Sequence, residues 1–144
     1  MQLTTYTDYA LRALLYIGSQ PAGKRAQVKE IASAYHISLH HLQKIVHELG
    51  KSGLIETVRG KNGGIMLAKE PQEIGIGMLI RTLEGMDLVE CFNENGQCAI
   101  QCACKLKSVL HEAQQAFLAV LDRYTLDDLL HNKSDLYSLF QQQT

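Results

Sequence analysis

The chain has 144 residues, of which 46% are hydrophobic, and its 14 Lys and Arg nearly balance its 15 Asp and Glu. This length suits one compact domain or a small domain with an appendage, and the high apolar content at a low net charge excludes a disordered chain. No apolar run approaches the roughly 18 uncharged residues of a membrane helix, and Asp8 and Arg12 lie where a signal peptide needs an apolar core. We therefore expect a cytoplasmic protein with no membrane partner.

Three helices are predicted in the N-terminal part of the chain. The first covers about four turns around residues 9–17, where apolar side chains recur at helical spacing. A second apolar stripe lies at 28–35, and Ser38 is a suitable N-cap for a third helix whose inward apolar positions run from Leu39 to Leu49. Because the second and third helices are short and joined by a tight turn, they predict a helix-turn-helix.

Two short β-prone stretches follow, at 54–58 and 65–68. The segment between them, residues 59–64, reads RGKNGG, and its glycines and asparagine can adopt the positive φ of a hairpin turn. A hairpin in this position predicts the wing of a winged helix-turn-helix.

Three further helices are predicted in the rest of the chain. One lies at 74–83, and a longer one lies at 106–121, where apolar residues recur at helical spacing for about four turns. So long an apolar stripe has few partners within so small a chain, which favours a dimer interface. A last short helix is predicted at 125–130, and the Gln-rich end at 141–144 is expected to fray.

The fold class is therefore mainly α with a small β-wing: a winged helix-turn-helix joined to a long dimerisation helix. The predicted segments are an N-terminal helix and winged helix-turn-helix DNA-binding domain at 1–69, a connecting helix at 70–90, a cysteine-bearing loop at 91–104, and a dimerisation helix with a C-terminal helix at 105–144.

The formal net charge of −1 conceals two oppositely charged halves. Residues 1–69 hold nine Lys and Arg and four acids, a net charge of +5, whereas residues 70–144 hold five and eleven, a net charge of −6. This asymmetry is expected if only the N-terminal half meets phosphate. The candidate DNA-binding residues, on the helix-turn-helix and at the wing tip, are Lys29, Ser38, His40, His41, Gln43, Lys44, Arg59, Lys61 and Asn62. The alternative is a solvated helix face beside an ordinary hairpin, or a module that binds a protein.

All four cysteines of the chain lie between positions 91 and 104: Cys91, Cys98, Cys102 and Cys104. A zinc site generally has two pairs of thiols spaced C-x2-4-C, whereas the spacing here is C-x6-C-x3-C-x-C. Irregular spacing on a loop suits an iron–sulfur cluster. A zinc site, unligated thiols or a redox pair of Cys102 and Cys104 remain alternatives. No arrangement of Ser, His and Asp and no phosphate-binding glycine motif suggests an enzyme.

Taken together, several segments resemble the bacterial IscR/NsrR family of iron–sulfur regulators. They are the opening Leu3–Arg12, the helix-turn-helix ending in His41–Lys44, the wing Val58–Gly64, the helix from Ile76 to Gly85 and the cysteine loop. The resemblance covers essentially the whole chain, and the wing and the cysteine loop are its most specific parts.

The resemblance implies a homodimeric repressor that binds double-stranded operator DNA and senses nitric oxide through an iron–sulfur cluster. One branch of the family uses a histidine soon after the third cysteine, where this chain has Lys107. The nitric-oxide-sensing branch is the better match, and it implies a cluster held by Cys91, Cys98 and Cys104, with Asp8 supplied by the other subunit. It favours [4Fe–4S] over [2Fe–2S].

In this interpretation, nitrosylation or loss of the cluster removes the weak oxygen ligand first and releases the operator. Cys102 departs from the family pattern and is a possible alternative ligand. Two further hypotheses are a regulator of iron–sulfur assembly or redox state on the same fold, and a zinc or thiol-switch winged-helix protein with a protein partner.

Overall fold

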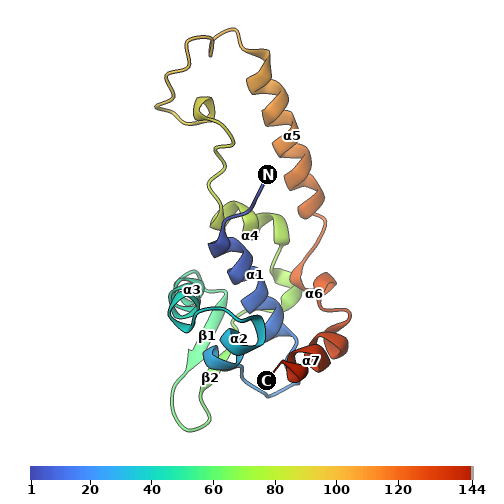
Figure 1. The fold of residues 1–144 in the computed structure, drawn as a ribbon. Helices are drawn as coiled ribbons and strands as arrows, with labels where there is room; N and C mark the ends of the chain where they lie inside the picture. Colours follow the sequence, from blue (N-terminus) through green and yellow to red (C-terminus); the bar gives the residue numbers. More distant parts are fainter. Residues whose placement is uncertain (144) are drawn as a thin grey trace. The chain divides into compact units, whose positions relative to one another are not determined.

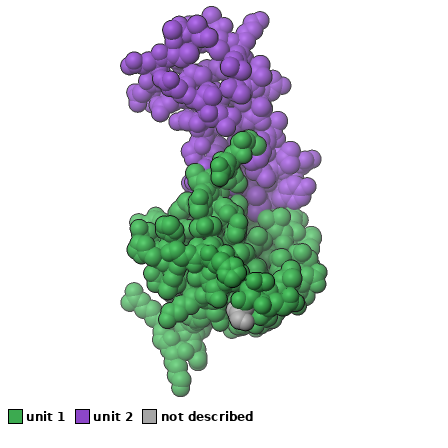
Figure 2. Space-filling model, in the orientation of Figure 1, with its two compact units in different colours: residues 1–74, 125–144 green, residues 75–124 purple. Residues whose placement is uncertain are grey.

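The computed structural model describes residues 1–143, which form two compact units: residues 1–74 with 125–143, and residues 75–124 (Figure 2). No helix among the described residues is long and apolar enough to cross a membrane. In chain order (Figure 1) the elements are α1 Thr5–Gly18, α2 Val28–Tyr35, α3 Leu39–Lys51, β1 Ile55–Val58, β2 Gly64–Leu67, the 3-10 turn η1 Pro71–Glu73, α4 Ile76–Leu83, the 3-10 turn η2 Glu90–Phe92, α5 Lys105–Leu121, α6 Leu126–Leu129 and α7 Lys133–Gln142.

The core of the first unit is built around α1, whose inward residues Ala10, Ala13 and Leu14 are fully buried. The helix begins where the Thr4 hydroxyl accepts a hydrogen bond from the backbone N–H of Thr7 at 3.3 Å. Both α2 and the wing strand β2 contribute to this core, and α3 packs against both α1 and α2. The predicted mainly α fold with a winged helix-turn-helix is therefore confirmed.

The tight turn of the helix-turn-helix is made by His36, which ends α2 in the left-handed region at φ 54°. The next helix, α3, buries one stripe along its length, while Leu39 at its start is only half-buried. Ser38 occupies the N-cap position as predicted, but its side chain makes no capping hydrogen bond. The buried members of the stripe are Leu42, Ile45, Val46 and Leu49.

The wing is an antiparallel hairpin of β1 and β2, in which Ile55 pairs with Leu67 and Val58 pairs with Gly64. Its bounds agree with the prediction to within one residue at each end. A further bridge joins Ala26, just before α2, to Ile65 of β2. The hairpin is thus attached to the helical core along one edge.

The C-terminal helix α7 was not predicted from the sequence. It returns to the first unit, where the Phe140 ring lies 4.8 Å from that of Tyr16 and 5.3 Å from that of Tyr35, measured between centroids. The expected frayed end is only partly correct, because α7 continues to Gln142, and Thr144 lies outside the described residues. The predicted segment 105–144 is therefore divided between the two units.

The second unit consists of α4, the long segment that carries the cysteines, and α5. Arg81 of α4 donates two hydrogen bonds to Asp122 beyond the end of α5, at 2.5 and 2.7 Å, and holds the pKa of that carboxyl below its ordinary value. A Cβ at Gly77 would collide with the same carboxylate, so α4 and Asp122 approach closely. The helix predicted at 74–83, within the connecting segment 70–90, corresponds to α4, Ile76–Leu83.

The apolar stripe of α5 is largely open to solvent in the single chain. Leu118 is the one buried residue of this helix, whereas Leu106 is 62% exposed, Val109 57% and Val120 46%. The predicted long amphipathic helix is therefore present, and most of its apolar face has no partner within the described residues.

Candidate functional site

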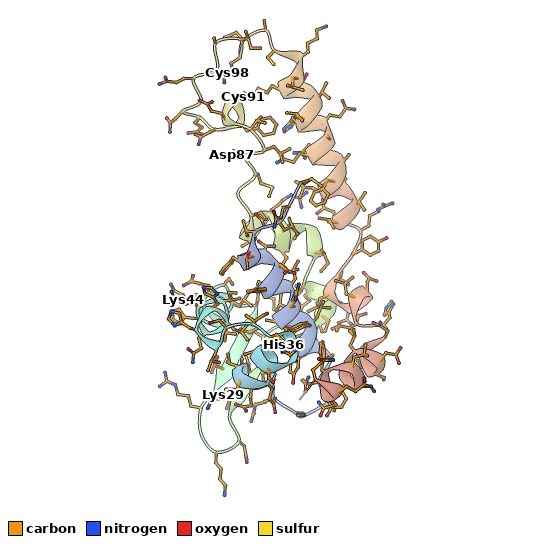
Figure 3. All side chains as sticks on the ribbon, viewed as in Figure 1. Lys29, His36, Lys44, Asp87, Cys91 and Cys98 are labelled. Atoms are coloured by element: carbon orange, nitrogen blue, oxygen red, sulfur yellow. The ribbon has the colours of Figure 1, made fainter. Side chains whose placement is uncertain are left out.

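The exposed face of α3 carries the side chains predicted to read DNA. His40, His41, Gln43 and Lys44 are all exposed and lie opposite the buried stripe of the same helix. Figure 3 shows Lys44 on this face. The second helix of a helix-turn-helix reads base edges in the major groove, and these side chains are free of the core to do so. Lys29 and Ser38, at the starts of α2 and α3, are exposed as well.

The wing tip exposes the other three candidates, Arg59, Lys61 and Asn62. Its turn depends on glycine at two places. Gly60 has φ +107°, and a Cβ on Gly63 would collide with the backbone oxygen of Val58. A narrow tip of this kind brings two cations to its end with little steric bulk, which suits entry into a minor groove.

The cysteine loop is irregular, and it presents all four thiols unpaired. Cys91 lies in η2 and is half-buried, Cys98 and Cys102 are exposed, and Cys104 is the half-buried N-cap residue of α5. Among residues 1–143, no three His, Cys, Asp or Glu side chains are grouped closely enough to hold a metal ion. A single chain in this conformation therefore does not bring the predicted ligands together.

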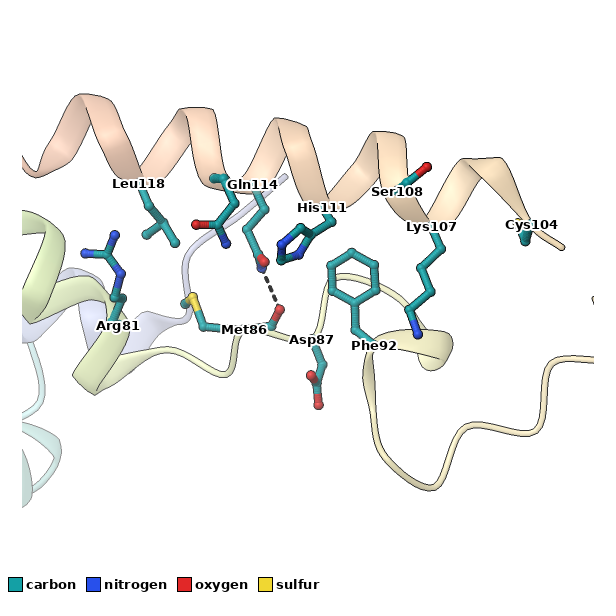
Figure 4. A pocket seen from close by; sticks show the side chains of 11 residues that line it. Arg81, Met86, Asp87, Phe92, Cys104, Lys107, Ser108, His111, Gln114 and Leu118 are labelled. Atoms are coloured by element: carbon teal, nitrogen blue, oxygen red, sulfur yellow. Dashed lines mark hydrogen bonds between the residues drawn. The ribbon is translucent and has the colours of Figure 1, made fainter. Parts of the chain in front are cut away.

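A groove of about 670 Å³ lies between the first part of the loop and α5 (Figure 4). The Gln114 amide donates a hydrogen bond to the backbone oxygen of Met86 at 2.5 Å, and the Phe92 ring meets His111 edge-on at 6.1 Å. His111 is exposed, and its ring also supports Phe92, the residue next to Cys91. These contacts attach the N-terminal end of the loop to α5.

Asp8, the fourth predicted ligand, lies in the first turn of α1 and is held by an arginine that sequence analysis missed. Both oxygens of the Asp8 carboxylate contact the Arg12 guanidinium at 2.9 Å. That guanidinium also lies over the rings of Tyr9 and Tyr35, 5.8 and 5.6 Å from their centroids. Burial raises the pKa of Tyr35 to about 12, although Arg12 acts in the opposite direction. The i, i+4 spacing signals the pairing with Asp8, whereas the contact with Tyr35 depends on the fold.

An exposed recognition-helix face, a cationic wing and a separate cysteine-bearing unit define a winged-helix DNA-binding regulator. The family model described as Rrf2, iron-dependent transcriptional regulator, matches residues 3–132. The chain belongs to this family.

Curated relatives agree with this assignment over nearly the full length of the chain. A regulator named HTH-type transcriptional regulator NsrR from Shouchella clausii is 56% identical and covers 100% of this chain and 98% of its own. Relatives of the same name from Halalkalibacterium halodurans and Bacillus subtilis are 54% and 46% identical, each covering 98% of both chains. These relatives are transcriptional regulators, so the chain is a regulator of transcription and not an enzyme.

Solved structures show the same fold. CymR, the global cysteine regulator of B. subtilis, matches with a TM-score of 0.72 and 29% identity over 90% of this chain and 95% of its own. IscR of T. potens matches with the same TM-score and identity over 92% and 88%. The predicted winged-helix class is thereby confirmed.

Proposed function

We propose that the chain forms a homodimeric repressor that binds operator DNA and senses nitric oxide through a [4Fe–4S] cluster. This proposal depends on one observation: all four thiols of the chain are free and lie on one irregular loop of the second unit, while the first unit holds a winged helix-turn-helix. The resemblance noted in the sequence, and relatives named NsrR, support the same function.

The donor set fits such a cluster. Thiolates are the usual ligands of iron–sulfur clusters, and Cys91, Cys98 and Cys104 would supply three of them. The loop contains only one short 3-10 turn between Asp87 and Cys104, so it can change shape to bring its thiols together. The partner subunit's Asp8 would complete the set, and the bound cluster would supply iron that reacts with nitric oxide.

The proposed homodimer interface is the exposed apolar face of α5. Its exposed Leu106, Val109 and Val120 form an apolar surface that one chain leaves uncovered. Complete burial of a Leu or Val side chain contributes about 1.5–3 kcal/mol, so pairing of this helix with a second copy would strongly favour association. A dimer is also the state in which one subunit's Asp8 can serve the other's cysteine loop.

The connection from Asp8 to DNA runs through α1. This helix packs against α3, the proposed recognition helix, and Asp8 and Arg12 stand on its first turns. If Asp8 bound the partner's cluster, it would constrain the helix against which α3 packs. Release of Asp8 would remove that constraint, and binding of a two-fold operator is sensitive to the positions of both recognition helices.

Treatment with nitric oxide is expected to weaken operator binding of anaerobically prepared protein by roughly 5- to 150-fold, the range of ordinary coupling free energies. The measurement is fluorescence anisotropy with a duplex selected from a random pool by the untreated protein. Chelator-stripped protein is the control for cluster loss, and iron and sulfide analysis distinguishes [4Fe–4S] from [2Fe–2S]. Equal operator affinity of the intact, nitrosylated and stripped forms would falsify the sensing function. A colourless protein that contains zinc would overturn the assignment of an iron–sulfur cluster.

Arg59→Ala is expected to weaken operator binding about ten- to a hundredfold, because it removes a cation from the exposed wing tip. Lys133→Ala, which removes an exposed cation at the start of α7, is the charge-matched control and should leave the affinity within about twofold. The visible spectrum should be unchanged in both variants. Equal affinities of the two variants would contradict a role of the wing in DNA binding.

A further inference from the structure

The wing is held by more than its own two strands. A two-stranded hairpin by itself is only marginally stable in water. Within the turn, the Gly63 N–H donates a hydrogen bond to the Gly60 oxygen at 2.9 Å. The position of the tip must therefore depend on contacts from outside the hairpin.

Those contacts come from residues 25–27, the segment that leads into α2. Ala26 and Ile65 exchange two backbone hydrogen bonds, at 2.9 and 2.8 Å. The flanking side chains reach further, to the carbonyls of the turn itself. The Arg25 guanidinium donates to the Asn62 oxygen at 2.6 Å, and the Gln27 amide donates to the Gly63 oxygen at 2.7 Å.

The fit between this segment and the hairpin is close. Gly64 has φ +147°, and a Cβ at this position would lie 2.7 Å from the Ala26 oxygen and 2.8 Å from the Gln27 amide nitrogen. Only glycine permits that approach, so the two side-chain hydrogen bonds belong to a packed junction.

The same segment is fixed to the helix-turn-helix. Gln27 is the N-cap residue of α2, its backbone N–H donates to the Glu30 carboxylate at 3.1 Å, and its backbone oxygen accepts from the Ile31 N–H at 3.1 Å. In turn, α2 packs against α3. Residues 25–27 therefore connect the wing tip to α2, and through α2 to the recognition helix α3.

We infer that Arg25 and Gln27 are positioning residues for DNA binding: they hold the Asn62–Gly63 turn so that Arg59 and Lys61 keep a set position relative to α3. This inference rests on the proposed contact of the wing with DNA. In this inference Gln27 acts through its hydrogen bond to the Gly63 carbonyl and not through a contact with DNA. Because the tip is already fixed before binding, the complex does not lose the conformational entropy of ordering a mobile loop.

The test uses the full-length protein with Gln27→Met, which removes the amide donor and keeps both the side-chain length and the net charge. Gln72→Met, at an exposed glutamine of η1, is the matched control. In the absence of DNA, amide hydrogen exchange of residues 59–64 should become severalfold faster in Gln27→Met and should stay unchanged in Gln72→Met. Arg25→Met, with Lys133→Met as its charge-matched control, should have the same effect on exchange.

Binding of the selected operator duplex should weaken roughly two- to tenfold in Gln27→Met, the range for loss of one hydrogen bond. In a background that carries both Arg59→Ala and Lys61→Ala, Gln27→Met should have little further effect, because neither cation of the wing tip remains to be positioned. Unchanged exchange in residues 59–64, or an additive loss of affinity in that combined variant, overturns the positioning role while leaving the proposed function intact. If Arg59→Ala alone leaves operator affinity unchanged, the proposed wing contact fails, and the positioning role fails with it.

Discussion

Anaerobic reconstitution of Cys98→Ala with iron and sulfide is expected to give protein without the visible absorption of an iron–sulfur cluster, whereas Cys102→Ala should retain it. The two cysteines form a matched pair, because both are exposed, both are free thiols and both lie on the same irregular loop. Loss of either side chain should therefore cost little folding energy, and a difference between the variants reports ligation. The measurements are the absorption spectrum and the iron content per chain.

Cys104→Ala completes this comparison. It removes the half-buried thiol at the start of α5 and should also abolish the cluster. A cluster that survives in Cys104→Ala but is lost in Cys102→Ala would replace Cys104 by Cys102 in the proposed ligand set. Retention in all three variants would show that these thiols are not ligands.

Phe140→Ala is expected to lower the free energy of unfolding of the first unit by about 3–5 kcal/mol. The Phe140 side chain is 8% exposed and packs against the rings of Tyr16 and Tyr35, so its removal leaves a cavity between α7 and the helices that it contacts. Urea unfolding followed by circular dichroism measures the loss.

The matched control for this variant is the neighbouring residue on the same helix. Leu139 is 55% exposed, and Leu139→Ala should change the free energy of unfolding by only about 0.5 kcal/mol. If Phe140→Ala were no more destabilising than Leu139→Ala, the Phe140 ring would not anchor α7 to the rest of the first unit.

Elements whose signals are local were predictable from the sequence. The stripe from Leu42 to Leu49 has helical spacing, so it predicted both α3 and the exposed opposite face. The glycine-rich segment between two β-prone stretches predicted the wing almost to the residue. By contrast, α7 was missed because its sequence is polar and Phe140 finds its aromatic partners more than a hundred positions earlier in the chain.

The candidate site divides in the same way. Side-chain exposure on α3 and at the wing tip follows from local periodicity, and the clustering of four thiols is visible in the sequence alone. The groups that hold the turn of the wing cannot be found from the sequence alone, because the Gln27 amide and the Gly63 oxygen are separated by 36 positions. The stacking of Arg12 on Tyr35 is hidden for the same reason.

The helix-turn-helix, its wing, the charge division and the cysteine cluster were therefore predictable from local sequence, because each depends on neighbours in the chain. Tertiary packing was needed to show that residues 125–143 return to the first unit, that Asp8 is held by an arginine stacked on two rings, and that residues 25–27 hold the wing. Those contacts join distant segments, and their energy is available only after the helices between them have packed.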